Sequence, residues 1–213
     1  MKHDSLIVSE GLPFISVFGV FTLLAVFVLK HTWVAAFFLF ATVFTIWFFR
    51  NPERRTPEDE RLVISPADGL VLRIDEDVQH ELLSQPCRKV SIFMNVFNVH
   101  VNRAPCSGKV SMIRYYPGRF ISADLDKASE QNERNALLIR TDDGKDILTI
   151  QIAGLIARRI VCWVSEGAYL KKGERFGMIR FGSRLEVFLP KEARISVAVG
   201  DKVRAGETPL GTF

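Results

Sequence analysis

Apolar residues follow two patterns along the chain, continuous near the N-terminus and interrupted by polar positions after residue 62. Residues 11–29 and 32–49 carry no charged side chain, and only Lys30 and His31 separate these two runs. At ~1.5 Å per residue each run is about long enough to cross the ~30 Å hydrocarbon core of a bilayer. The pattern predicts an N-terminal helical hairpin that either spans the membrane or re-enters it.

Basic residues after the second apolar run predict the orientation of the hairpin. Arg50, Arg54 and Arg55 follow it directly. Because positive charge is retained on the cytoplasmic side, we expect a cell-membrane protein whose remaining chain lies on the cytoplasmic face against membrane lipids. A cleaved signal peptide is the competing interpretation, but the apolar region is too long for one and few basic residues precede it.

The remainder of the chain shows short apolar segments separated by turn residues, which is typical of strands. These segments cover residues 70–74, 89–94, 109–113, 136–139, 147–152 and 160–164. Residues 51–61 are charged and contain Pro52 and Pro57, which predicts a linker. We therefore expect an anchor over residues 1–50, a linker over 51–61, and a mainly β domain over 62–213.

A glycine pattern occurs twice in this domain. Gly167, Gly173 and Gly177 form the first copy, and Gly200, Gly206 and Gly211 form the second. In each copy a glutamate follows the middle glycine and an apolar strand precedes the first. Paired units of this kind resemble the halves of a barrel-sandwich fold. The expected fold class is thus mainly β (α+β), a barrel-sandwich-like domain with a helical anchor.

Charge and cysteine content narrow the classes of partner. The chain has 28 basic and 24 acidic residues, a net charge of +4 that suits an anionic membrane surface. The basic residues are dispersed and form no recognition helix, so no nucleic-acid partner is predicted. The three cysteines are widely spaced without zinc-ligand spacing, which predicts reduced thiols and no metal.

The pair Gly182-Ser183 interrupts what otherwise reads as one strand over residues 178–189. A β-bulge is the simplest interpretation of a mid-strand glycine. However, a serine hydroxyl beside the preceding carbonyl could also attack its own peptide bond. Further polar segments accompany this pair, at residues 65–69 with Asp68, at residues 95–105 with His100, and at residues 126–135.

Three of these motifs carry a family resemblance. His-Val-Asn-Arg at residues 100–103, Asp-Lys-Ala-Ser-x-x-Asn-Glu-Arg at 126–134, and Gly182-Ser183 occur in this order. Together they resemble the phosphatidylserine decarboxylase proenzymes of the short, Gly-Ser-processed type. The resemblance covers residues 63–213 and the apolar N-terminus.

The resemblance implies that the chain cuts itself between Gly182 and Ser183. Residues 1–182 and 183–213 would then remain together as a heterodimer, with a higher oligomer left open. Ser183 would become a pyruvoyl group, which takes the place of pyridoxal in converting phosphatidylserine to phosphatidylethanolamine during phospholipid biosynthesis. No metal is implied.

Candidate roles follow for the other polar residues. His100 is the expected general base, and Asp68 is expected to orient it as in hydroxyl-activating triads. For His100 the competing interpretation is a buried structural histidine, and for Asp68 it is a carboxylate that stabilises a turn. Longer bacterial members carry a second histidine where this chain has Arg103, a residue better suited to a phosphate or carboxylate. We assign Arg103, Arg158 and Arg159 to substrate binding.

A different class stays open at this point. The chain could be a non-catalytic, membrane-anchored barrel-sandwich adaptor. Such an adaptor normally carries a long helical hairpin between its barrel halves, and this sequence has no heptad stretch there. An adaptor would remain one chain, so the mass of the purified protein discriminates between the two hypotheses.

Overall fold

The computed structural model describes residues 4–123, 128–155, 159–180 and 182–213. The chain forms two compact units, residues 1–53 and residues 54–213, and each unit is described by itself. Continuous apolar sequence builds the first unit, and alternating sequence builds the second.

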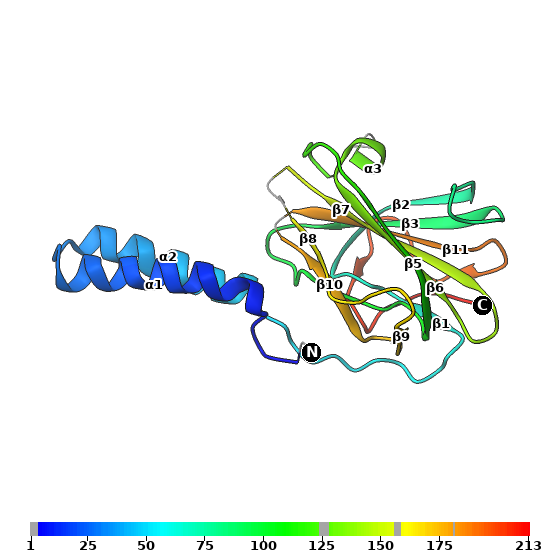
Figure 1. The fold of residues 1–213 in the computed structure, drawn as a ribbon, viewed down its shortest axis with the longest axis horizontal. Coiled ribbons are helices and arrows are strands. Elements are labelled where there is room, and N and C mark those ends of the chain that lie inside the picture. Colours follow the sequence, from blue (N-terminus) through cyan, green and yellow to red (C-terminus); the bar gives the residue numbers. More distant parts are fainter. Residues whose placement is uncertain (1–3, 124–127, 156–158, 181) are drawn as a thin grey trace. The chain divides into compact units, whose positions relative to one another are not determined.

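The first unit is a helical hairpin (Figure 1). The 3-10 turn η1 (Ser9–Gly11) leads into α1 (Leu12–Phe27), and α2 (Thr32–Phe48) returns alongside it. Between the two helices, the rings of Phe21 and Phe38 stack with centroids 5.1 Å apart, and the hydroxyls of Thr22 and Thr42 lie 3.3 Å apart. The entering and leaving segments pair at Ile7 and Arg50 in an isolated antiparallel bridge. The hairpin prediction is therefore confirmed.

Most apolar side chains of this hairpin face outward. Trp33 is 82% exposed and Phe40 is 70% exposed, because two helices cannot bury their outer faces against each other. Residues 9–27 form a helical stretch of 19 residues with a mean hydropathy of 1.9, which by length and composition could cross a membrane. The shorter α2 has 17 residues.

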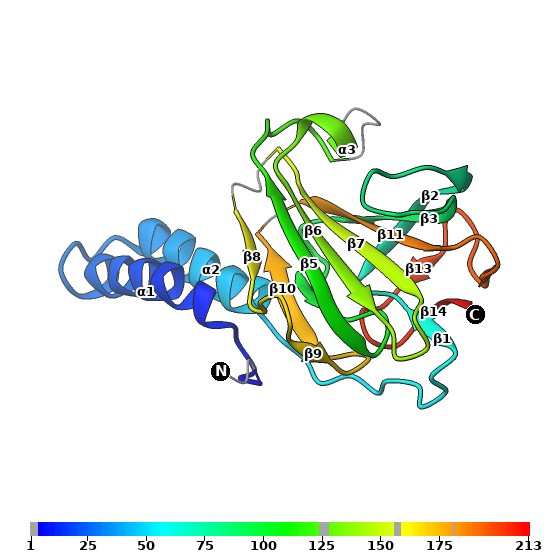
Figure 2. The same ribbon diagram turned by 45° about the vertical axis from the view of Figure 1, so that its right-hand side comes forward.

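The second unit is built mainly from antiparallel strands (Figures 1 and 2). The strands before the polar loop are β1 (Leu62–Ile64), β2 (Gly69–Val78), β3 (Cys87–Met94), β4 (Val101–Arg103) and β5 (Gly108–Tyr116). The short helix α3 (Ala128–Gln131) precedes β6 (Arg134–Arg140), β7 (Asp146–Ala153), β8 (Ile160–Cys162), β9 (Tyr169–Leu170) and β10 (Arg175–Ile179). The last strands are β11 (Ser183–Pro190), β12 (Arg194–Ile195), β13 (Lys202–Val203) and β14 (Pro209–Thr212).

These strands form one large and two small sheets. The large sheet has the order β13-β2-β3-β11-β7-β6-β5-β9, and the small sheets have the orders β4-β10-β8 and β1-β14-β12. One apolar core joins all three sheets, since it includes Val63, Ile92, Phe176, Leu185 and Leu210. The result is a curled, half-barrel β domain, as the strand pattern and the glycine repeat predict.

The two glycine copies adopt the same local conformation. Gly167 and Gly200 have φ of 86° and 95°, and Gly173 and Gly206 have φ of 80° and 79°. These left-handed values favour glycine over residues with a Cβ. The strands β9 and β13 then lie at opposite edges of the large sheet, while β10 and β14 lie at the centres of the two small sheets.

Candidate active site

Ser183 lies where the chain passes from one sheet to another. The strand β10 ends at Ile179 in a small sheet, and β11 begins at Ser183 between β3 and β7 of the large sheet. The expected single strand with a bulge is thus two strands in different sheets. In the antiparallel register Ser183 is opposite Met94 on one side and Ala153 on the other. The serine is 0% exposed, because strands cover it on both sides.

Backbone packing restricts the carbonyl group that precedes Ser183. A Cβ built on Gly154 would overlap the carbonyl oxygen of Gly182 and lie 3.2 Å from Cβ of Ala123. Gly154 is therefore glycine because the Gly182 carbonyl approaches its backbone closely. By contrast, a Cβ on Gly182 would meet no described atom within 4 Å. No described neighbour therefore demands glycine at position 182, so the unhindered carbonyl there is available for attack.

A chain of buried polar side chains leads to the Ser183 hydroxyl. Ser183 Oγ donates to Met94 Sδ at 3.4 Å, and Asn102 Nδ2 donates to the same sulfur at 3.9 Å. Gln151 Nε2 donates to Asn102 Oδ1 at 2.8 Å, and Asn135 Nδ2 donates to Gln151 Oε1 at 3.0 Å. All five side chains are buried. The strands β3, β4, β6, β7 and β11 each contribute one of them.

Sequence reasoning assigned no role to Met94, Asn102 or Gln151. The available signal was weak: Gln151 is an amide between Ile150 and Ile152, and strand alternation turns it to the side opposite from these neighbours. An isolated polar residue on the buried side of a strand indicates a buried partner, but the sequence does not say which residue that partner is.

His100 is buried just before β4. Its Nδ1 lies 3.0 Å from the carbonyl oxygen of Asn98. Because a carbonyl only accepts, Nδ1 carries the proton and Nε2 is the basic nitrogen of the neutral ring. The backbone carbonyl of His100 accepts the amide hydrogen of Ile179 at 3.3 Å, which ties the histidine segment to the end of β10.

Asp68 lies in a different set of contacts from the expected one. Its carboxylate forms a bidentate ion pair with Arg54 Nη2, at 3.0 and 2.8 Å, and accepts the amide hydrogen of Ala205 at 2.8 Å. The His100 ring contacts the Asn98 carbonyl, and the Ser183 hydroxyl donates to Met94. The expected Ser183–His100–Asp68 series stays a prediction.

The three arginines expected to bind substrate differ in their surroundings. Arg103 is 5% exposed and donates to the carbonyl oxygen of Gly173 at 2.9 Å. Its side chain also lies close to Gly206, whose built Cβ would be 2.7 Å from Arg103 Cδ. Arg159 is exposed, and its carbonyl oxygen accepts the amide hydrogen of Arg180 at 3.2 Å. Arg158 is outside the described residues.

Part of the polar loop motif is anchored beside Ser183. Asn132 is fully buried, and its Nδ2 donates to the carbonyl oxygens of Ile121 and Ala153 at 2.8 and 2.7 Å. Ser129 donates to Glu186 Oε1 at 2.6 Å and accepts from Arg184 Nη1 at 2.9 Å. These contacts hold the segment after residue 127 against β7 and β11. Residues 124–127 of the motif lie outside the described part.

The thiols and the carboxylates offer no competing centre. The three cysteines are free, and burial raises the pKa of Cys106 to about 12 and also raises the pKa of Cys162. Thiols with raised pKa values are poor nucleophiles at neutral pH. Among the residues that the structure describes, no group of three or more His, Cys, Asp or Glu side chains could hold a metal ion.

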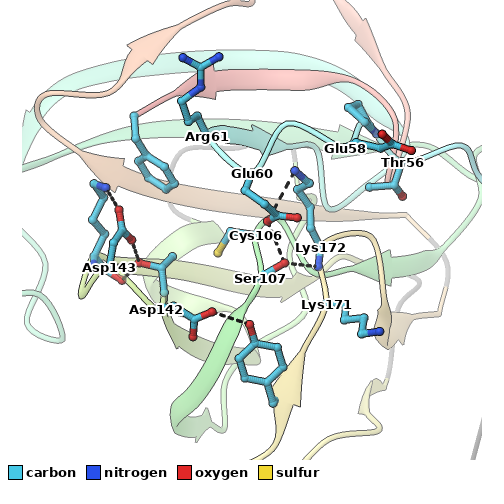
Figure 3. A pocket seen from close by; sticks show the side chains of 15 residues that line it. Thr56, Glu58, Glu60, Arg61, Cys106, Ser107, Asp142, Asp143, Lys171 and Lys172 are labelled. Atoms are coloured by element: carbon cyan, nitrogen blue, oxygen red, sulfur yellow. Dashed lines mark hydrogen bonds and ion pairs between the residues drawn. The ribbon is translucent and has the colours of Figure 1, made fainter.

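A pocket between the segments 56–61, 106–107, 141–145 and 169–172 is drawn in Figure 3. It has a volume of about 870 Å³ and is lined by residues 56–58, 60–61, 106–107, 141–143, 145, 169, 171–172 and 213. Several of its charged groups pair with one another: Lys172 Nζ lies 3.8 Å from Glu60 Oε2, and Lys145 pairs with Asp143. None of the candidate catalytic residues lines this pocket.

Comparison with known proteins bears on this arrangement. Residues 41–211 match the family described as phosphatidylserine decarboxylase. The chain is 73% identical over 213 residues to the phosphatidylserine decarboxylase proenzyme of Syntrophus aciditrophicus (strain SB), covering all of both chains. It is 50% identical over 202 residues to the protein of the same name from Desulfotalea psychrophila (95% of this chain, 94% of that one). A third relative of that name, from Magnetococcus marinus, is 49% identical over 213 residues (99% and 97%). These matches favour the enzyme over the adaptor. The chain therefore belongs to the phosphatidylserine decarboxylase family and is an enzyme of the carboxy-lyase class.

Proposed function

We propose that this protein decarboxylates phosphatidylserine to phosphatidylethanolamine after cutting itself between Gly182 and Ser183. The observation that carries the proposal is the position of Ser183, buried as the first residue of β11, directly after a carbonyl that packs against Gly154. The chain crosses from a small sheet to the large sheet just before Ser183. This crossing supports the proposal because Ser183 Oγ has to turn toward the carbonyl of Gly182.

The proposed self-cleavage needs no oxidant or reductant. Ser183 Oγ attacks the carbonyl carbon of Gly182, the C–N peptide bond breaks as a C–O ester bond forms, and the Ser183 nitrogen becomes an amine. β-Elimination then removes the Ser183 α-proton and expels the Gly182 carboxylate, leaving a dehydroalanine. Water adds to this group and ammonia leaves, so the 183–213 chain begins with a pyruvoyl group. One water molecule is consumed in total.

His100 is the proposed base of this reaction. With Nδ1 holding its proton on the Asn98 carbonyl, Nε2 is able to accept one. The hydroxyl of Ser183 has to leave Met94 and turn toward a base for the attack, which makes the described state a resting precursor. Asp68 is proposed to act at a distance, by fixing Arg54 and the segment at Ala205. His100→Ala should slow self-cleavage by roughly 10²–10⁴-fold, as expected for a lost general base.

The residues around position 183 fit a pyruvoyl group. The pairing with β3 and β7 fixes the backbone from residue 183 onward, and the Gly182 side has no described neighbour within 4 Å of a built Cβ. When formed, the group supplies a ketone that captures the substrate amine and takes up the electron pair released as CO2 departs. No metal is part of the proposal.

Substrate binding is proposed for Arg159, because an exposed arginine suits a phosphate or carboxylate headgroup, and for Arg158, which precedes it in the sequence. Arg103 already donates to the Gly173 carbonyl, so its proposed contribution is to hold the turn of the first glycine copy until a substrate competes for it. The hairpin of α1 and α2 is proposed to attach the enzyme to the cell membrane with the β domain on the cytoplasmic face, since Arg50, Arg54 and Arg55 follow it.

The two processed chains are proposed to remain together as a heterodimer. The 183–213 segment provides β11, β12, β13 and β14. Because β11 lies between β3 and β7, cleavage at residue 183 removes no strand pairing. The small chain would leave only if the large sheet separated at its centre.

The intact mass of the purified full chain tests the proposal. We expect two chains, of which the smaller lacks the mass of one ammonia relative to a chain that begins with serine. Ser183→Ala should remain one chain of 24.1 kDa and release no CO2 from phosphatidylserine, because alanine has no nucleophile. Ser111→Ala, in β5, is the matched control and should process normally. A Ser183→Ala protein that still decarboxylates phosphatidylserine would sink the proposal.

A further inference from the structure

The buried contacts of Met94 carry an inference that rests on the proposed self-cleavage. We propose that Met94 is a positioning residue for the Ser183 hydroxyl, and that Asn102 and Gln151 act through it by fixing the thioether. The sulfur accepts from Ser183 Oγ at 3.4 Å and from Asn102 Nδ2 at 3.9 Å. Both hydrogen-bond partners of the sulfur are thus donors, one the nucleophile and one an amide.

A thioether suits this task because it is a weak acceptor. It orients the hydroxyl of Ser183 without competing strongly for its proton, so a small rotation frees Oγ for attack. Methionine by itself is flexible, with three rotatable bonds, and would orient nothing without a second contact. The amide of Asn102 provides that contact and limits the positions of Sδ.

The amide hydrogen bonds that lead to Met94 all run in the same donor-to-acceptor direction. Asn135 donates to Gln151, Gln151 donates to Asn102, and Asn102 donates to the sulfur. Gln151 and Asn102 each accept at the amide oxygen and donate at the amide nitrogen, so each polarises the next group. The register supports this series, since Asn135 is opposite Gln151 and Gly177 is opposite Asn102.

The energetic cost of burying three amides in series indicates that they have a function. Buried amides lower stability unless they are paired, and an apolar core of the same shape would avoid the problem. Apolar side chains pack around the sulfur, with Ile92, Leu137 and Leu185 in the same cluster as Met94. A connected amide series that ends on the sulfur beside Ser183 therefore indicates that hydroxyl orientation is its purpose.

Met94→Leu tests the inference, because it keeps the apolar volume and removes the acceptor. The full chain is made by cell-free synthesis in detergent, and the appearance of two chains is followed over time. We expect self-cleavage to slow by about tenfold or more, since misplacement of a reacting group costs up to ~100-fold. Met178→Leu is the matched control, since Met178 in β10 is equally buried, and it should cleave at the normal rate.

Two further measurements distinguish positioning from packing. After cleavage is complete the hydroxyl no longer exists, so decarboxylation per cleaved Met94→Leu molecule should match that of the unsubstituted protein. The double variant Asn102→Leu/Gln151→Leu keeps Met94 but removes the amides that fix it. It should slow cleavage by less than Met94→Leu, and it also serves if Met94→Leu does not fold.

Failure of the inference is separable from failure of the proposed function. An unsubstituted chain that never cuts itself removes the self-cleavage proposal. An unsubstituted chain that cuts, together with a Met94→Leu chain that cuts equally fast, overturns the positioning role alone. Equal slowing in Met94→Leu and Met178→Leu also overturns it, because packing would then explain the effect.

Discussion

The two glycine copies have the same local structure and different surroundings. Gly167 and Gly200 begin the copies with left-handed φ values, and each copy adds a short strand to one edge of the large sheet. The following strands, β10 and β14, each lie at the centre of a three-stranded sheet. Similar sequence thus produces similar turns twice, through backbone requirements that act within a few residues.

The chain continues differently after each copy. The strand β14 pairs with β1 and β12 and ends the chain at residue 213. The strand β10 pairs with β4, which comes directly after His100, and the chain then crosses to Ser183. The last glycines show the contrast: a Cβ on Gly177 would lie 3.1 Å from Gln151 Nε2, whereas one on Gly211 would meet the Arg194 carbonyl at 2.5 Å. The repeat therefore provides the scaffold, and the neighbours of one copy provide the site.

Among the glycine substitutions, the largest effect is expected for Gly154→Ala, beside the carbonyl to which the chain leads after the first copy. The added methyl would overlap the Gly182 carbonyl oxygen, so the carbonyl must move away from its position for attack. We expect self-cleavage to slow by about 100-fold, measured as chain separation over time. Gly144→Ala, in a turn with no neighbour within 4 Å, is the control and should lose stability only. Normal cleavage by Gly154→Ala would show that this close approach does not position the bond.

A second pair of substitutions compares the last glycines of the two copies. Gly177→Ala and Gly211→Ala both press a methyl against a neighbouring backbone carbonyl, of Val161 and Arg194, and each should cost roughly 1–3 kcal/mol. Only Gly177→Ala also meets the Gln151 amide, so only it should slow self-cleavage. Thermal unfolding measures the loss of stability, and the rate of self-cleavage measures the effect on processing. If the two variants cleave at one rate, the difference between the copies is not functional.

The first glycines offer the cleanest test of equivalence. Cβ atoms built on Gly167 and Gly200 meet nothing within 4 Å, so the cost of alanine there comes from the left-handed backbone alone. We expect Gly167→Ala and Gly200→Ala to lose about 1–2 kcal/mol each, with unchanged cleavage. Denaturant unfolding of the full chain gives both values. Unequal losses of more than about 1 kcal/mol would contradict the local equivalence of the copies.

The last effect, which is absent at neutral pH, concerns a buried thiol near the first copy. Cys106 precedes Ser107, whose hydroxyl accepts the amide hydrogen of Lys172 in that copy. Burial raises the pKa of Cys106 to about 12. An acid whose pKa is raised by folding stabilises fully below its unfolded pKa of ~8.5, and this contribution is lost as pH rises toward about 12. The free energy of unfolding should fall between about pH 8.5 and 11, and Cys106→Ala should make that fall smaller. At neutral pH the ranking of the glycine variants by stability should stay the same. If Cys106→Ala and the unsubstituted protein show the same pH dependence, Cys106 is not the group that causes the fall.

Patterns within short windows of sequence determined much of this protein. Continuous apolar runs over residues 11–29 and 32–49 were sufficient to predict the helical hairpin, and alternation predicted the strands of the β domain. The glycine spacing predicted two paired units of a barrel-sandwich-like fold, and their turns have the same backbone conformation. Motifs were sufficient to identify Ser183 and His100 as candidates and to identify the family. Each of these inferences depends on periodicity or residue identity over a few positions.

Only the tertiary structure decided which groups meet at Ser183. The hydroxyl contacts Met94, 89 positions away, and the amides of Gln151 and Asn102 are 49 positions apart. Asp68, expected beside His100, pairs instead with Arg54 and Ala205. The close approach of Gly154 to the Gly182 carbonyl arises where β7 ends beside the start of β11. Contacts of this kind depend on sheet order and strand register, which the burial of the whole core sets cooperatively, and no local sequence pattern encodes them.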